Sequence, residues 1–134
     1  MVTTNQLRQL AQFLPELESR EFKAGEMRGG ESDGAGVFTM PYAGYSDTVN
    51  ALVQHAYYHG WILRDFNWSE WAQTQEARDL FNNAEALAKA TPDQLAQLLT
   101  LFIRQDRFAE GTLLDAFNSG LILRIVQRAA ALSA

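Results

Sequence analysis

Apolar residues recur at three- and four-residue spacing along most of the chain, which is the period of a buried helix face. Near the start, Thr3 and Gln6 have the spacing of a capping box. The leucines that follow share one predicted helix face: Leu7, Leu10, Leu14 and Leu17. The pattern predicts a first helix over residues 4–18, with Pro15 close to its end.

The middle of the chain has two further start signals. Ser46 is a suitable N-cap for a helix over residues 47–59. Asn67 has the matching N-cap position for a short helix that begins at Trp68. Residues 75–90 then have a helical pattern that asparagines interrupt. We therefore expect three helical segments in this part of the chain.

The last third has the clearest local signal. The run from Thr91 to Gln94 combines an N-cap threonine, a proline at the first helical position and a glutamine that closes the capping box. Apolar positions continue through Phe117 to a stop at Gly120, and a last helix follows. The face of that helix is apolar: Leu121, Ile122, Ile125, Val126 and Ala129.

The helical period is absent between residues 21 and 44, where glycines bracket the polar run 31–33. Partly alternating apolar positions at residues 21–27 and 37–40 predict a short β-ribbon around a mobile loop. The expected fold is mainly α, a compact bundle of five to six helices with a minor β-ribbon near residues 21–40. Residues 1–134 would form a single domain, with 21–44 as a glycine-rich insertion.

Composition narrows the class of protein. The 134 residues include no cysteine, which excludes disulfides and thiolate chemistry and makes the cytoplasm the default location. The N-terminus has no signal-peptide pattern, and no apolar run is long enough for a membrane span. A net charge of −5 disfavours nucleic acid and anionic membranes as partners.

Charge is nevertheless uneven along the chain. Residues 90–134 carry four acidic residues and four arginines, so this part is neutral overall. The arginines are Arg104, Arg107, Arg124 and Arg128. A local site for an anion is therefore possible in the last third of the chain.

The strongest candidate for chemistry is a polar cluster at the end of the predicted helix after Thr91: Arg104, Asp106, Arg107 and Glu110. In the functional interpretation, the guanidinium groups hold a carboxylate or phosphate, and a carboxylate orients the ligand or moves a proton. In the structural interpretation, Asp106 caps the following helix and the charges pair with one another. The spacing is compatible with both.

His55 and His59 lie four residues apart, so one helix face would present both rings. Two ligands do not complete a metal site, and the sequence offers no further histidine or cysteine. The glycine-rich segment lacks the lysine of a phosphate-binding loop. We therefore expect neither a metal nor a cofactor, and no catalytic residue is assigned.

A cluster of aromatic residues is the second candidate surface: Trp61, Phe66, Trp68 and Trp71. Such residues grip a partner protein or stack on bases when they are exposed, but they are more often part of a core. Acidic neighbours at Asp65 and Glu70 argue against a nucleic-acid platform. Any exposed part would therefore be a protein interface.

Several short motifs over residues 37–131 occur together in an order that resembles a small prokaryotic family of unknown function. The most specific is the run Arg-Gln-Asp-Arg-Phe-x-Glu-Gly at residues 104–111, and others are Met40-Pro41-Tyr42 and Asp65-Phe66-Asn67-Trp68. The resemblance leaves out the first helix and the glycine loop. It implies a domain type and no activity.

The sequence thus predicts a non-enzymatic accessory or interaction domain that binds another protein or itself. The alternative is an enzyme or small-anion-binding protein that uses Arg104, Asp106, Arg107 and Glu110. The missing metal set, nucleophile and phosphate loop favour the first hypothesis.

Overall fold

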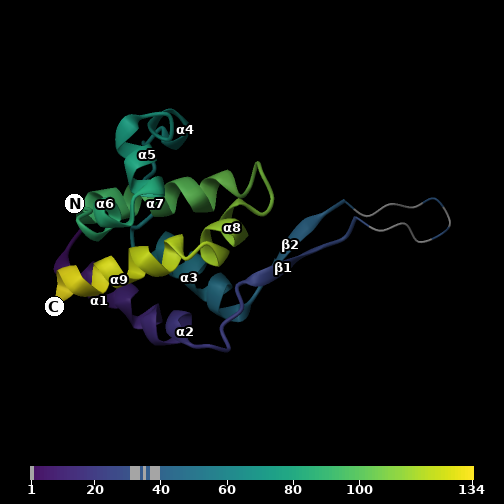
Figure 1. Ribbon diagram of the computed structural model, residues 1–134, viewed down its shortest axis with the longest axis horizontal. Coiled ribbons are helices and arrows are strands. Elements are labelled where there is room, and N and C mark those ends of the chain that lie inside the picture. The colour runs from purple at the N-terminus through teal and green to yellow at the C-terminus, as the bar shows by residue number, and fades with distance from the viewer. Residues whose placement is uncertain (1, 31–33, 35, 37–39) are drawn as a thin grey trace.

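The computed structural model describes residues 2–30, 34, 36 and 40–134. Helices gather into one body, and a two-stranded antiparallel ribbon extends away from it (Figure 1). The elements are α1 Thr4–Leu10, η1 Ala11–Phe13, α2 Leu14–Glu18, β1 Gly25–Arg28, β2 Tyr42–Tyr45, α3 Asp47–Tyr58, α4 Trp68–Trp71, α5 Gln75–Asn82, α6 Ala84–Ala88, α7 Pro92–Gln105, α8 Thr112–Asn118 and α9 Leu121–Ser133. The predicted fold class, mainly α with a minor ribbon, is confirmed. Within the described part of the chain, no helix has the length and apolar character needed to cross a membrane.

Side-chain caps begin the helices where the sequence placed them. Thr3 and Thr91 each form a complete capping box with the glutamine three residues later. Ser46 caps α3, and the Asn67 side chain accepts a hydrogen bond of 3.1 Å from the Glu70 amide at the start of α4. These caps satisfy amides that a helix cannot pair internally.

Two predicted helices are interrupted. Residues 4–18 contain the 3₁₀ turn η1 one residue before Pro15, which has no N–H to continue the hydrogen-bond ladder. Residues 75–90 divide at Asn83, whose extended backbone ends α5 and whose side chain caps α6. Both breaks are local consequences of one residue type, and the pattern of apolar positions continues across them.

The core lies between α7, α9, α1 and the segment that leads into α4. Trp61 is fully buried, as are Leu98 and Leu99 of α7. The buried Thr100 hydroxyl lies 3.1 Å from the Trp61 carbonyl oxygen and accepts a hydrogen bond of 3.0 Å from the Leu63 amide. This one polar side chain therefore fixes an irregular segment against α7 without leaving its own oxygen unpaired.

The ribbon pairs β1 with β2 so that Met27 lies opposite Ala43 and Arg28 opposite Tyr42. The first strand, Gly25–Arg28, overlaps the predicted segment 21–27, and its partner among the described residues lies at Tyr42–Tyr45, after the predicted segment 37–40. Residues 37–39 lie outside the described residues, as do residues 31–33 of the predicted mobile loop. Gly25 allows the two strands to approach, because a Cβ there would overlap the carbonyl oxygen of Gly44.

Candidate functional site

The loop between α7 and α8 is built around one carboxylate oxygen. Asp106 Oδ1 accepts hydrogen bonds from the Gly111 amide at 3.0 Å and the Leu113 amide at 3.1 Å. It accepts a third, at 2.8 Å, from the phenol of Tyr45. Asp106 therefore holds the start of α8 in place, as the structural interpretation of the sequence anticipated.

Tyr45 connects this loop to the ribbon. Its phenol oxygen donates to Asp106 and accepts a hydrogen bond of 3.2 Å from the Leu114 amide. Burial raises the pKa of Tyr45 well above its usual value, and the hydrogen bond to Asp106 and the carboxylate's charge raise it further. The phenol therefore stays protonated at neutral pH and acts as a fixed donor.

Glu110 makes the second bond between the loop and the ribbon. Its Oε2 atom accepts a hydrogen bond of 3.0 Å from the backbone amide of Ala43 in β2. Gly111, which follows, adopts a positive φ of 98° and is buried beneath Met27 of β1. A Cβ on Gly111 would come within 3.3 Å of the Met27 sulfur, so the ribbon requires glycine at this position.

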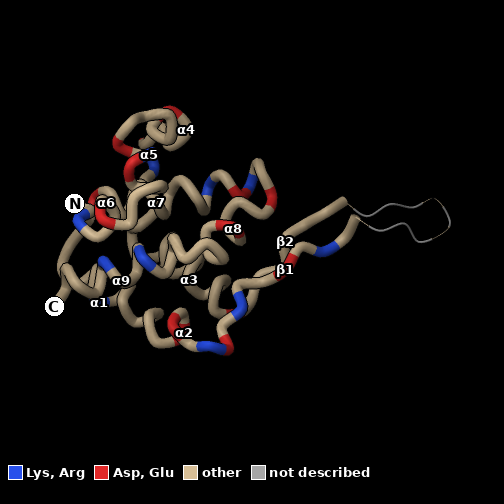
Figure 2. The backbone as a smooth tube through the Cα atoms, in the orientation of Figure 1, with Lys and Arg blue, Asp and Glu red and all other residues tan. Residues whose placement is uncertain are grey.

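The two arginines of the predicted cluster do not pair with its carboxylates. Among the residues that the structure describes, the one ion pair joins Arg28 to Glu26. Arg107 is exposed, whereas the Nε atom of Arg104 is buried without a hydrogen-bond acceptor. Figure 2 shows the alternating positive and negative positions along this loop.

A small cavity lies beside the clasp that Tyr45 and Asp106 form. It has a volume of about 230 Å³, and its polar lining includes Asn50, Tyr57 and Arg107. Tyr45 is protonated and Oδ1 of Asp106 already accepts three hydrogen bonds from the protein, so the geometry favours a structural role for the clasp.

Residues 2–134 match the family of unknown function DUF6508. The chain belongs to this family. The match includes the first helix and the glycine-rich segment, which the resemblance noted in the sequence had left out. No curated protein and no solved structure matches the chain significantly. Membership of DUF6508 therefore supplies a family and no activity.

The predicted aromatic cluster of this DUF6508 chain is mostly core. Trp61 and Trp71 are buried, and the Trp71 ring lies 5.6 Å from that of the half-buried Phe66. Trp68 is also half-buried and stacks on Phe108 of the α7–α8 loop, with ring centroids 6.1 Å apart. Phe108 is 78% exposed and is therefore the aromatic residue that this region presents to solvent.

The two histidines of the DUF6508 chain lie on one face of α3, as predicted, with ring centroids 4.3 Å apart. Burial lowers the pKa of His55, and the neighbouring charge of His59 lowers it further. The described residues contain no group of three metal-binding side chains. His55 instead makes an edge-on contact with the ring of Phe13 at 5.3 Å.

Two residues of this site have no local signal in the sequence. Tyr45 meets Asp106 across 61 positions, and Met27 meets Gly111 across an even longer separation. The one available signal was that side chains alternate between the two faces of a strand, which places the β2 side chains of Tyr45 and Ala43 on the same face. The sequence therefore singled out Asp106 and Glu110, but it gave no signal for the ribbon residues that bind them.

Proposed function

We propose that this protein is a non-enzymatic interaction domain that binds a second copy of itself by pairing the free edge of β1. The observation that carries this proposal is a difference between the two edges of the ribbon. Two outward backbone groups of β2, the Ala43 amide and the Tyr45 carbonyl, are bonded to side chains, whereas the outward groups of β1 have no partner among the described residues.

The register shows which backbone groups point outward. The Ser46 amide donates to the Ala24 carbonyl at 2.8 Å, so these two residues form a hydrogen-bonded pair. Such pairs alternate along an antiparallel ladder with pairs whose amides and carbonyls face away. In β1 the outward-facing residues are therefore Gly25 and Met27, opposite Tyr45 and Ala43.

Side chains cover the edge of β2. Glu110 accepts from the Ala43 amide at 3.0 Å, and the Asn50 side chain reaches the Tyr45 carbonyl at 3.5 Å. The α7–α8 loop therefore occupies this side of the ribbon. An open strand edge is a template for pairing with another strand, and β1 provides the open edge here.

The charges of β1 fit an antiparallel copy of the same strand. If two β1 strands pair about Met27, the two Met27 residues exchange both outward hydrogen bonds. Glu26 of one copy then lies opposite Arg28 of the other on both sides of the centre. Opposite charges facing each other across strands stabilise a pair, so a second copy is the occupant that this edge favours.

Exposed apolar side chains of the ribbon and of the adjoining loop add surface that a partner can bury. The ribbon, its approach and the adjoining loop include four large apolar residues that are at least 44% exposed. They are Met27, Met40, Tyr42 and Phe108. Their burial in a dimer would supply the hydrophobic part of the interface, which main-chain bonds alone lack.

The decisive experiment measures molar mass by sedimentation velocity over a range of protein concentrations. The wild type is expected to shift from monomer to dimer, and Met27→Pro is expected to remain monomeric over the same range. Proline removes the outward amide of Met27, which the β1–β2 ladder does not use, so the ribbon itself can still form. Circular dichroism and denaturation of Met27→Pro verify that the helical body is intact.

A charge-exchange series is the matched control. Glu26→Arg alone places like charges opposite each other across the proposed interface and should weaken the dimer. The double variant Glu26→Arg with Arg28→Glu restores opposite charges and should recover the dimer. A wild type that stays monomeric throughout, or a Met27→Pro variant that dimerises normally, contradicts the proposal.

The alternative role is binding or conversion of a small anion at Arg104, Asp106, Arg107 and Glu110. The cavity beside Asp106 and Arg107 favours it, and the hydrogen bonds that already occupy both carboxylates argue against it. A ligand that raises the melting temperature of the wild type but not of Arg107→Gln would support this role.

In either role, the proposed setting is the cytoplasm of a prokaryote. Support comes from the absence of cysteine and from the family resemblance of residues 37–131.

A further inference from the structure

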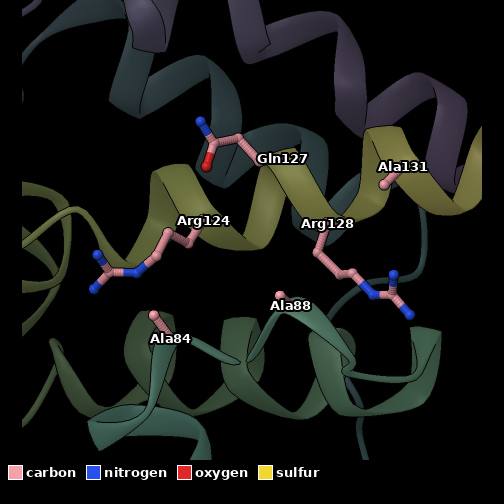
Figure 3. A pocket seen from close by; sticks show the side chains of 6 residues that line it. All are labelled: Ala84, Ala88, Arg124, Gln127, Arg128 and Ala131. Carbon is pink, nitrogen blue, oxygen red and sulfur yellow. The ribbon is translucent and has the colours of Figure 1, made fainter. Parts of the chain in front are cut away.

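A second cavity lies between α6 and α9 and has no residue of the ribbon in its lining (Figure 3). Its volume is about 210 Å³. Small apolar side chains and the stems of two arginines form most of its wall. The lining residues are Ala84, Ala88, Arg124, Gln127, Arg128 and Ala131.

Arg124 is placed where a positive charge is unfavourable. Its Nε atom is buried and has no acceptor among the described residues. A nitrogen of its guanidinium group comes within 3.6 Å of the position that a Cβ on Gly120 would take, at the N-terminal end of α9. That end of a helix repels cations, and the first turn of α9 contains no acidic residue.

Arg128 adds a second positive charge one turn along α9. Its Nε atom donates to the Ala90 carbonyl at 2.9 Å, so one of its donors is used. No carboxylate lines the cavity, and no described carboxylate oxygen pairs with either arginine. Figure 2 shows α9 with positive positions and no negative one. Two like charges at this spacing destabilise a helix unless an anion lies near them.

The two guanidinium groups point away from each other along α9, with Ala84 and Ala88 facing the space between the two arginines (Figure 3). The cavity thus offers a positive group at each end and an apolar floor in the middle. Guanidinium groups match the planar, two-oxygen geometry of a carboxylate. The volume is below the usual range of drug-sized ligand pockets, so the ligand must be small.

We propose that this cavity binds a short-chain dicarboxylate, with one carboxylate at Arg124, the other at Arg128 and the methylene chain over the alanines of α6. Such a ligand neutralises both positive charges, which no described carboxylate does. The chain between the carboxylates excludes water from Ala84 and Ala88, which a simple inorganic anion cannot do.

The test is calorimetric titration with succinate, glutarate, adipate, pimelate and suberate at constant ionic strength. Hexanoate serves as the probe with a single carboxylate. The bisphosphate of butane-1,4-diol serves as the probe with two phosphate groups. The expected result is a preference for one chain length, at least about tenfold tighter than hexanoate, because each end then makes a charge-assisted contact. Equal affinity for all carboxylates, or no binding by any of them, overturns the proposal. Tighter binding of the bisphosphate overturns the assignment to carboxylates.

Four variants locate the site. Arg124→Met and Arg128→Met keep the apolar stems and remove the charges, and each should weaken the preferred diacid by about tenfold or more. Ala88→Leu fills the cavity without changing any charge and should also weaken binding. Lys89→Met removes a cation next to Ala88 but outside the lining, so it should bind as the wild type does. Equal losses in Lys89→Met and Arg124→Met would mean general charge attraction and would overturn the site.

Discussion

The carboxylates of the α7–α8 loop have partners within the protein, whereas the arginines of the α6–α9 cavity have no carboxylate partner in the described part of the chain. In the loop, Asp106 accepts three hydrogen bonds and Glu110 accepts one, so the carboxylates hold backbone amides of the protein itself. In the cavity, Arg124 and Arg128 have no carboxylate partner among the described residues. The loop was the stronger candidate site from sequence, but its acids are already engaged.

The comparison distinguishes a polar cluster that stabilises the fold from one that can bind a ligand. A carboxylate that accepts hydrogen bonds from backbone amides stabilises the fold. Less of its hydrogen-bonding capacity then remains for a ligand. A buried guanidinium donor without an acceptor costs stability until something binds it. Unmet hydrogen-bonding capacity, and not the number of charges, therefore points to the place where a ligand is expected.

Removal of the Asp106 side chain should have the largest effect. Asp106→Ala leaves the Tyr45 phenol and two amides at the start of α8 without their acceptor, and should lower the free energy of unfolding by about 3 kcal/mol. Urea denaturation measures the loss. Glu110→Ala is the matched control, because its exposed carboxylate makes a single bond and should cost less than about 1 kcal/mol. Equal losses would contradict the central role of Asp106.

Tyr45→Phe tests the same clasp from the ribbon. It removes one hydroxyl that donates to Asp106 and accepts from the Leu114 amide, at a cost of about 2 kcal/mol. Tyr57→Phe is the control, since Tyr57 is 44% exposed and its hydroxyl makes no hydrogen bond to the described residues. A loss of stability as large in Tyr57→Phe would show that the aromatic ring environment, and not the clasp, is responsible.

The two arginines of α9 should differ in their response to methionine. Arg128→Met loses the bond to the Ala90 carbonyl and should cost about 1 kcal/mol. Arg124→Met removes a buried donor that has no acceptor, together with a cation at the wrong end of α9, and should leave stability unchanged or raise it by about 0.5 kcal/mol. Thermal and urea denaturation without added ligand measure both. The reverse order would mean that Arg124 is already satisfied.

The smallest expected effect concerns His55, whose Nε2 atom is also buried without a partner. Because burial and His59 lower its pKa in the folded state, the unfolded chain binds the proton more tightly. Stability should therefore be complete above about pH 6.5 and fall as pH decreases from there toward the folded-state pKa. Urea midpoints from pH 7.5 to 5 measure this slope. His55→Gln should reduce it, and an unchanged slope would assign it to other groups.

Local signals predicted the helices well because their causes are local. Thr3, Ser46, Asn67 and Thr91 cap the helices as the sequence indicated, since an N-cap acts within three residues of itself. Pro15 lay near the end of the predicted first helix, and the 3₁₀ turn Ala11–Phe13 precedes it by one residue. The described second strand, Tyr42–Tyr45, lies just after the predicted segment 37–40, because short strands have weaker local start and stop signals than capped helices.

The candidate site was predicted in part for the same reason. Arg104 lies in the last turn of α7, and Asp106, Arg107 and Glu110 follow in the α7–α8 loop, where the Asp106 side chain accepts amides at the start of α8. The ion pairs suggested by the spacing of Arg107 and Glu110 do not form, because the Ala43 amide of β2 takes the carboxylate instead. Neither Tyr45 nor the cavity between α6 and α9 could be inferred from periodicity, since each depends on contacts between distant segments.

The packing of α1 against α9 has a consequence for synthesis on the ribosome. Leu7 and Leu10 of α1 are buried in the core that α9 helps to close, although more than 100 positions separate the two helices. During translation, the apolar face of α1 therefore stays without its packing partner until α9 has left the exit tunnel. The nascent chain thus exposes apolar surface for most of its synthesis, and chaperones that bind such surface would encounter its first helix before its last one exists.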